Sequence, residues 1–109
     1  MSEAKGQAQR YRSGRLEIRP DEHAALVDGR PLSLTVRELQ LLTELAFHAE
    51  RIMSREELYA AVWGRTARRS DRSLDVYVSR LRAKLGSAMP ELKLIHTHNG
   101  IGYRFSSDA

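Results

Sequence analysis

Apolar and polar residues alternate along the first part of the chain, as they do in β-strands that are buried on one side. Leu16 and Ile18 stand between charged neighbours, which is typical of a half-buried strand. Asp28-Gly29 is a two-residue hairpin signal, because Gly tolerates the positive φ that such a turn needs. Pro31 favours a short strand or one at a sheet edge. The pattern predicts three short strands, which cover residues 15–18, 24–27 and 30–32.

The apolar spacing then changes to that of α-helices. Thr35 with Glu38, and Ser54 with Glu57, each have the spacing of a capping box, in which side chain and backbone cap each other at a helix start. These signals predict two helices, over residues 36–48 and 55–62. The second helix is expected to end at Gly64 and to face inward with Leu58, Ala61 and Val62.

A third helix is predicted over residues 71–85, ending before Gly86. At about 100° per residue, one narrow arc is apolar and holds Leu74, Val78, Leu81 and Leu85. The opposite arc holds Arg72, Ser73, Val76, Ser79, Arg80 and Ala83, and the flanks hold Tyr77, Arg82 and Lys84. Long cations, hydroxyls and small apolar groups on one face are suited to a DNA major groove, where they can contact bases and phosphates. The alternative is that Val76 and Ala83 pack against another element or a partner.

The end of the chain has the pattern of a β-hairpin. Asn99-Gly100 marks its turn, and residues 103–105 form its return strand. In the first strand, Leu92, Leu94 and His96 are expected to share one face, and Lys93, Ile95 and Thr97 the other. The residues expected in the core are Leu39, Leu42, Leu45, Leu58, Leu74, Val78, Leu81 and Phe105.

Three helices followed by a hairpin are the order of a winged helix-turn-helix, an α+β fold with an N-terminal antiparallel sheet and a C-terminal hairpin wing. The chain of 109 residues suits one such domain. We expect the domain to cover residues 14–106, preceded by a linker or disordered segment (1–13) and followed by a short tail (107–109). The chain shows no secretory signal and no apolar run that could span a bilayer. With no cysteine, it fits a cytoplasmic protein best.

Composition adds one point, which is the location of the positive charge. The formal net charge is +4, and residues 64–84 hold seven Lys/Arg against two Asp. The remainder of the chain is close to balanced. A clustered basic stretch is typical of a surface that binds a polyanion, although a solvated basic helix face would look the same.

Four stretches together resemble the OmpR/PhoB family of response-regulator output domains: "LTVRELQLLTEL", "ERIMSREELYAAVWG", "SDRSLDVYVSRLRAKLG" and "GIGYRF". The resemblance covers about residues 14–106. It implies a four-stranded N-terminal sheet, a third helix that recognises DNA, and sequence-specific binding of double-stranded DNA that regulates transcription in a two-component system. It also implies tandem binding, as a dimer, to direct repeats. The family's phosphorylated receiver domain has no counterpart here, so the chain is either a fragment or a short free-standing relative.

The resemblance also assigns sites. The positions that match DNA contacts are Arg72, Ser73, Val76, Tyr77, Arg80 and Arg82 in the helix and Thr97, Asn99 and Gly100 in the wing; the helical periodicity adds Ser79. Trp63 and the loop with Arg65, Arg68 and Arg69 match a region that contacts phosphate or RNA polymerase. Asn99 stands where family members often carry an arginine, and Ser79 where some carry a cation.

Other functions are less consistent with the sequence. His96 and His98 share one strand face, but two imidazoles without a third ligand make a weak metal site, so no metal or cofactor is expected. No hydrolase motif or phosphate-binding loop occurs, which speaks against an enzyme. A winged helix used only for protein contacts would carry an apolar or acidic third helix. A DNA-binding domain from a different regulator architecture remains open.

Overall fold

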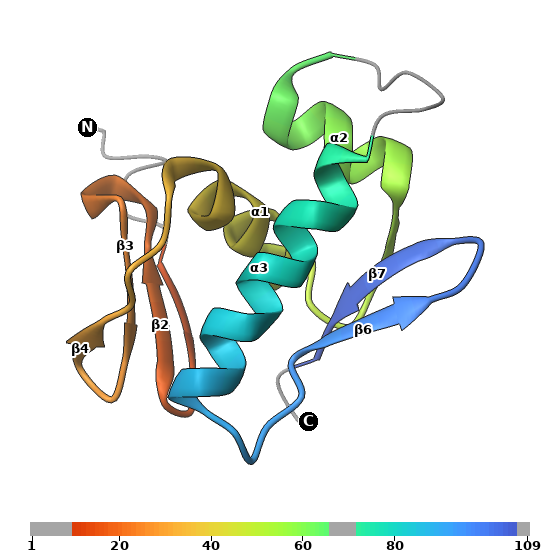
Figure 1. The fold of residues 1–109 in the computed structure, drawn as a ribbon. Helices are drawn as coiled ribbons and strands as arrows, with labels where there is room; N and C mark the ends of the chain where they lie inside the picture. Colours follow the sequence, from red (N-terminus) through yellow and green to blue (C-terminus); the bar gives the residue numbers. More distant parts are fainter. Residues whose placement is uncertain (1–9, 66–71, 107–109) are drawn as a thin grey trace.

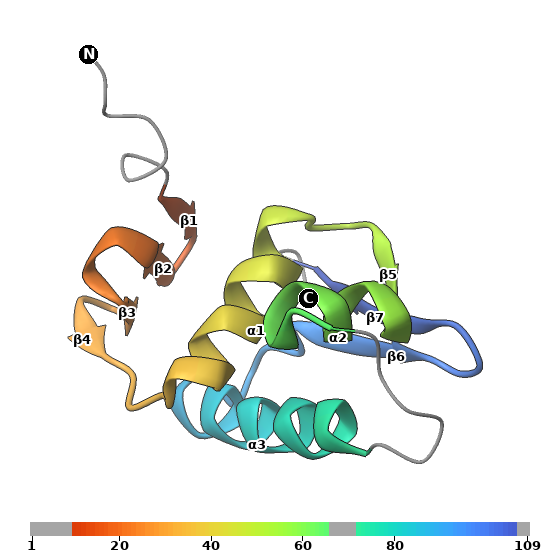
Figure 2. The same ribbon diagram turned by 90° about the horizontal axis from the view of Figure 1, so that it is seen from above.

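A computed structural model describes residues 10–65 and 72–106 of the chain. Two small antiparallel sheets lie on opposite sides of three helices (Figures 1 and 2). The fold is the expected α+β winged helix. In chain order the elements are β1 (Tyr11–Ser13), β2 (Leu16–Arg19), the 3-10 helix η2 (Pro20–Glu22), β3 (Ala24–Val27), β4 (Arg30–Pro31), α1 (Val36–Phe47), β5 (Ile52–Ser54), α2 (Arg55–Trp63), α3 (Ser73–Ala88), β6 (Ile95–His98) and β7 (Gly102–Phe105).

The N-terminal sheet has the order β1-β2-β3-β4, and every neighbouring pair is antiparallel. Leu16 and Ile18 are buried as their alternation predicted, and Leu16 pairs with Val27 on β3. Asp28 and Gly29 both have positive φ, at 55° and 79°, which confirms the predicted hairpin turn. The four-stranded sheet implied by the family resemblance is present.

The first strand, β1, corrects the expected start of the domain. Tyr11–Ser13 lies in the segment taken for a linker, yet it pairs with β2. The Tyr11 ring packs on Phe105, with centroids 5.7 Å apart, and on Phe47 at 6.2 Å. These ring contacts reach across the chain, but the pairing with β2 is local, across a turn at Gly14 with φ 56°. Residues 1–9 and 107–109 of the expected linker and tail lie outside the described residues.

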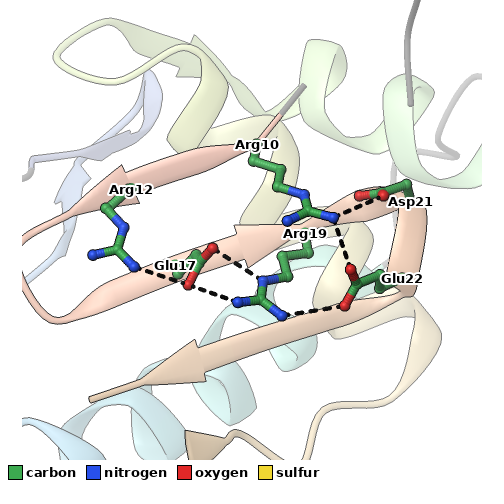
Figure 3. A network of polar contacts seen from close by, with 6 residues as sticks. All are labelled: Arg10, Arg12, Glu17, Arg19, Asp21 and Glu22. Atoms are coloured by element: carbon green, nitrogen blue, oxygen red, sulfur yellow. Dashed lines mark hydrogen bonds and ion pairs between the residues drawn. The ribbon is translucent and has the colours of Figure 1, made fainter. Parts of the chain in front are cut away.

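The solvent face of this sheet carries a network of ion pairs (Figure 3). Arg19 Nε lies 3.0 Å from Glu17 Oε2, and Arg10 Nη2 lies 2.7 Å from Glu22 Oε2. The network joins β1, β2 and η2 through Arg10, Arg12, Glu17, Arg19, Asp21 and Glu22. Three cations balance three carboxylates, and all the pairs except the partly buried Arg19–Glu17 are exposed, so they contribute little to stability. The network therefore has charged side chains but no net charge.

Both predicted capping boxes are present. In α1, Thr35 Oγ1 accepts from the Glu38 amide at 3.2 Å, and Glu38 Oε1 accepts from the Thr35 amide at 2.8 Å. Ser54 and Glu57 repeat this pattern at the start of α2, which ends at Gly64 in a left-handed conformation. One inward-facing residue was wrong: Ala61 is exposed, and Tyr59 is buried in its place. The buried side of α2 is thus turned toward Tyr59, whose ring stacks on Trp63.

The third helix, α3, begins and ends later than predicted: it starts at Ser73, with Arg72 at its N-cap, where the prediction started at residue 71. It runs through Gly86 to Ala88, because Gly86 does not adopt the positive φ that would end a helix. The buried Met89 follows and closes the last turn with a bond from its amide to Leu85 O at 2.8 Å. The apolar stripe of α3 is buried as predicted. All eight residues predicted for the core are buried: Leu39, Leu42, Leu45, Leu58, Leu74, Val78, Leu81 and Phe105.

The C-terminal hairpin belongs to a three-stranded sheet of order β5-β7-β6. The apolar pattern did not predict β5, a three-residue strand that pairs with β7 through Met53 and Tyr103, fifty residues apart. The turn at Asn99-Gly100 is confirmed, with Gly100 at φ 78°. The alternation expected from Leu92 onward is wrong, because Leu94 and Ile95 are both buried and β6 begins only at Ile95.

Gly102 on β7 provides a test of this sheet. A Cβ at Gly102 would lie 1.9 Å from Met53 O on β5, so Gly102→Ala should force the strands apart. We expect the free energy of unfolding to fall by at least about 1–3 kcal/mol, the usual cost of overpacking. Chemical denaturation of both proteins measures the difference.

Gly86→Ala is the matched control. A Cβ there meets nothing within 4 Å, and the position is helical. Ala should therefore stabilise the protein by about 0.5–1 kcal/mol. If Gly102→Ala were as stable as the wild-type protein, this would contradict the close approach of Met53 O on β5 to Gly102 on β7.

Candidate nucleic-acid interface

The side of α3 opposite the apolar stripe is open to solvent. Val76 keeps 43% of its surface exposed, and Arg72, Ser79, Arg80 and Ala83 are exposed as well. Ser73, at the first position of the helix, is half-buried. In Figure 1 this helix crosses the front of the molecule beside the β6–β7 hairpin. The predicted outward arc is thus a continuous surface of two cations, two hydroxyls and two small apolar groups. These groups can contact base edges, thymine methyls and phosphates.

Arg82 connects this helix to the wing. Its guanidinium donates a hydrogen bond through Nη2 to Thr97 Oγ1 on β6, and it lies 5.5 Å from the centre of the Tyr103 ring. Two residues predicted to contact DNA, Arg82 and Thr97, are therefore brought together by bonding to each other. Arg82 is half-buried, so part of its donor capacity is used inside the protein.

Asp75 joins three elements, a role that the sequence pattern did not predict. Arg55 Nη2 of α2 lies 2.5 Å from Asp75 Oδ2, and the Tyr103 hydroxyl of β7 donates to Asp75 Oδ1 at 2.7 Å. Burial alone would raise the pKa of the Asp75 carboxyl, but the bonds from Arg55 and Tyr103 outweigh it and hold that pKa below its ordinary value of 3.8. The sequence does show an acidic residue within a basic helix, which could have marked Asp75. Its partners could not be predicted, because Arg55 and Tyr103 lie 20 and 28 residues away along the chain.

Glu38 holds the other end of α3. Its carboxylate is only 1% exposed, and Oε1 accepts from Lys84 Nζ at 2.6 Å as well as from the Thr35 amide. Burial would raise the pKa of Glu38, but the bonds from Lys84 and Thr35 hold it below its ordinary value. The charge of Lys84 is therefore neutralised by the buried carboxylate of Glu38 on α1.

An aromatic cluster of Tyr59, Trp63 and Tyr77 fills the space between α2 and α3. Tyr59 and Trp63 stack with centroids 4.7 Å apart and an interplanar angle of 13°. Tyr77 meets Trp63 edge-on at 5.5 Å. The Arg65 guanidinium lies 5.3 Å from the Tyr59 ring centre. Trp63 and Arg65, predicted to contact phosphate or polymerase, thus have protein neighbours, while Arg68 and Arg69 lie outside the described residues.

The tip of the wing is exposed. Asn99 and Gly100 are both accessible, and Ile101 keeps 55% of its surface exposed. The Ile101 amide donates to His98 O at 2.9 Å, which closes the turn. The tip therefore presents an amide and an apolar side chain, with no cation at the turn.

The two wing histidines have protein surroundings of their own. His98 Nε2 accepts from Arg104 Nε at 3.1 Å, whereas His96 Nε2 is buried without a partner. Burial, followed by the charge of Arg104, lowers the pKa of His96. Within residues 10–65 and 72–106, no group of three or more His, Asp or Glu is arranged to hold a metal ion. The helices of that same portion are too short or too polar to cross a membrane.

Comparison with known proteins gives a direct match. Residues 29–105 match the family described as "Transcriptional regulatory protein, C terminal". The chain belongs to this family, within the OmpR/PhoB group. The phosphate regulon regulator PhoB of Escherichia coli is 36% identical over 92 residues, which is 84% of this chain and 40% of PhoB. The regulator ResD of Bacillus subtilis is 39% identical over 95 residues, 86% of this chain and 40% of ResD. The chain thus spans less than half the length of these OmpR/PhoB relatives.

Solved OmpR/PhoB structures share the fold. The DNA-binding domain of Escherichia coli CpxR has a TM-score of 0.84 and 33% identity, covering 93% of this chain and 99% of that one. The Klebsiella pneumoniae RstA DNA-binding domain, solved in complex with the RstA box, has a TM-score of 0.81 and 35% identity, covering 91% and 98%. Both likenesses extend across nearly the whole chain.

Asp75→Asn tests the link between helix and wing. Asn keeps the shape but removes the charge that Arg55 and Tyr103 bind, so we expect a loss of about 1–3 kcal/mol in the free energy of unfolding near neutral pH. Because the folded pKa of Asp75 is lowered, its contribution is complete above 3.8 and disappears as the pH falls through the folded pKa. The gap between wild type and variant should therefore close in acid.

Asp28→Asn makes the same chemical change in the exposed pair with Arg15. Its effect should be much smaller, because exposed ion pairs are well screened. A pH-independent gap for Asp75→Asn would contradict the assignment of a charged Asp75 in the folded protein.

Proposed function

We propose that the chain binds double-stranded DNA sequence-specifically and regulates transcription as the output domain of a two-component response regulator. The observation that carries this proposal is the outward surface of α3, where exposed cations and hydroxyls surround Val76 beside a projecting wing. The solved complex of RstA with its box, at 35% identity, supports it. So does the AdeR DNA-binding domain in complex with an intercistronic region, at 25% identity.

The surface suggests a division of roles. Arg80, Ser79 and Val76 lie on the exposed arc and would face base edges in the major groove. Arg72 and Ser73 lie at the start of α3, where backbone amides also attract phosphate. Thr97, Asn99 and Gly100 would contact the backbone or minor groove through the wing. Arg82 would fix the angle between helix and wing; its Nε is buried, so a phosphate contact would fall to the terminal guanidinium nitrogens.

Several finer roles follow from the family resemblance. The loop with Arg65, Arg68 and Arg69, together with Trp63, would touch phosphate or RNA polymerase. Two domains would bind direct repeats in tandem, in the cytoplasm. The role is binding, with no catalytic step. A winged helix used only for protein contacts fits less well, because the open face of α3 is basic and polar.

Selection of bound sequences from a random duplex library at two salt concentrations tests the proposal. Enrichment of a short direct repeat, with affinity that falls as salt rises, would support a sequence reader that also contacts phosphates. Weak binding without enrichment at either salt would favour the protein-contact alternative.

Arg80→Ala is the sharpest single test. If Arg80 reads a base, the variant should lose about 1–3 kcal/mol of specific binding and relax the preference at one base pair. Arg30→Ala removes the same charge from an exposed position on β4, at the far side of the molecule from the wing (Figure 1). It should leave both affinity and preference close to those of the wild-type protein. Equal preference in Arg80→Ala would remove Arg80 from the reading surface.

A further inference from the structure

We infer that Tyr77 is a positioning residue that holds Arg80 ready to read its base. It would set base preference without contacting DNA itself. This inference rests on the proposed function.

The geometry starts at Arg80. Its guanidinium carbon lies 5.4 Å from the centre of the Tyr77 ring, within the range of a cation–π contact. The two residues are three apart on α3, so they are neighbours on the helix surface. No ion pair of Arg80 occurs among the described residues. Within the part of the chain that the structure describes, the Tyr77 ring is the contact shown for the Arg80 head group.

Tyr77 is in turn fixed by the aromatic cluster. It is half-buried, and its ring meets Trp63 edge-on at 5.5 Å with an interplanar angle of 68°. Trp63 is stacked on Tyr59, which is buried. The Tyr77 ring therefore cannot move outward into a DNA groove without breaking its contact with Trp63.

The support extends to α1. The Arg37 guanidinium lies 5.3 Å from the Trp63 ring centre and donates a hydrogen bond to Val62 O near the end of α2. Contacts therefore run from Arg37 through Trp63 and Tyr77 to Arg80, joining all three helices. Trp63 and Tyr77 together support Arg80. Their rings contact other side chains of the protein: Trp63 contacts Tyr59 and Arg37, and Tyr77 contacts Trp63 and Arg80.

Such support matters because arginine has a long, mobile side chain. Fixing it in a groove costs rotamer freedom, and a base contact formed by a restrained guanidinium loses less of that freedom on binding. A guanidinium that reads the O6 and N7 atoms of guanine must also lie in the plane of the base, so its orientation decides specificity. Restraint by Tyr77 should act on the preference at one base pair and not on affinity for every sequence.

The test compares library selections for the wild-type protein, Tyr77→Phe, Tyr77→Leu, Arg80→Ala and the double variant Tyr77→Leu/Arg80→Ala. Phe keeps the ring and should preserve the preference. Leu removes the ring, so discrimination at the Arg80 base pair should fall by about two- to fivefold, as expected for an exposed cation–π contact. In the double variant, Leu should add nothing to the loss caused by Arg80→Ala.

Tyr11→Leu is the matched control for a merely structural effect. Like Tyr77, Tyr11 is a half-buried tyrosine whose ring packs against other aromatic rings. Its neighbours are Phe47 and Phe105, and not the residues of α3. The control should lower stability and leave every base preference intact.

Three results would overturn the inference. Tyr77→Leu could weaken binding to all sequences alike, Tyr77→Phe could lose as much as Leu, or the two losses in the double variant could add. The second result would indicate that the hydroxyl contacts DNA directly. A wild-type protein that enriches no sequence would instead overturn the proposed function, so the two failures are distinguishable.

Discussion

The burial of one side of α3 is the constraint on which the other features depend. Leu74, Val78, Leu81 and Leu85 are each at most 4% exposed. Burial of a Leu or Val side chain contributes about 1.5–3 kcal/mol, so this stripe holds α3 more strongly than any surface bond could. A helix fixed on one side must present the opposite side to solvent. The open face with Val76 and Arg80 is thus a consequence of the core.

Apolar packing fixes α3 to the core and decides which side is open, but it leaves the angle between α3 and the wing less defined. Polar contacts supply that definition. Glu38 holds Lys84 near one end of α3, Asp75 holds Arg55 and Tyr103 near the other, and Arg82 reaches Thr97 between them. Hydrogen bonds depend on direction in a way that hydrophobic contacts do not. We attribute the fixed geometry of helix and wing to these bonds, and the stability mainly to the core.

The sequence predicted what is local. The capping boxes of α1 and α2, the Asp28-Gly29 turn and the inner stripe of α3 are all specified within a few residues, and all are confirmed. Two of the failures have non-local causes. β5 is held by β7, about fifty residues along the chain, and Gly86 stays helical because Met89 docks in the core. β1 is different, because it pairs with β2 across the short turn at Gly14 and Arg15, and this local turn signal was overlooked.

In the candidate site, too, local features were predicted and contacts between distant residues were not. Periodicity alone predicted which residues of α3 are exposed, since that depends only on the helix and its buried stripe. It could not show that Arg82 bonds to Thr97, nor that Asp75 binds Tyr103, because those pairs are joined by the fold.

These internal bonds also change how the basic stretch should be interpreted. Residues 64–84 hold seven cations, but Lys84 is neutralised by Glu38 and Arg82 is bonded to Thr97. Arg65 lies over the Tyr59 ring. The salt dependence of DNA binding follows the number of phosphates that cations neutralise, at a slope of about 0.9 per phosphate. A cation that is paired with a carboxylate, as Lys84 is with Glu38, adds less to that slope, whereas contacts with the uncharged Thr97 and Tyr59 leave the charges of Arg82 and Arg65 in place. The seven cations of this segment therefore overstate its electrostatic attraction to DNA by the charge of Lys84, and the other cations of the open face of α3 remain available to phosphates.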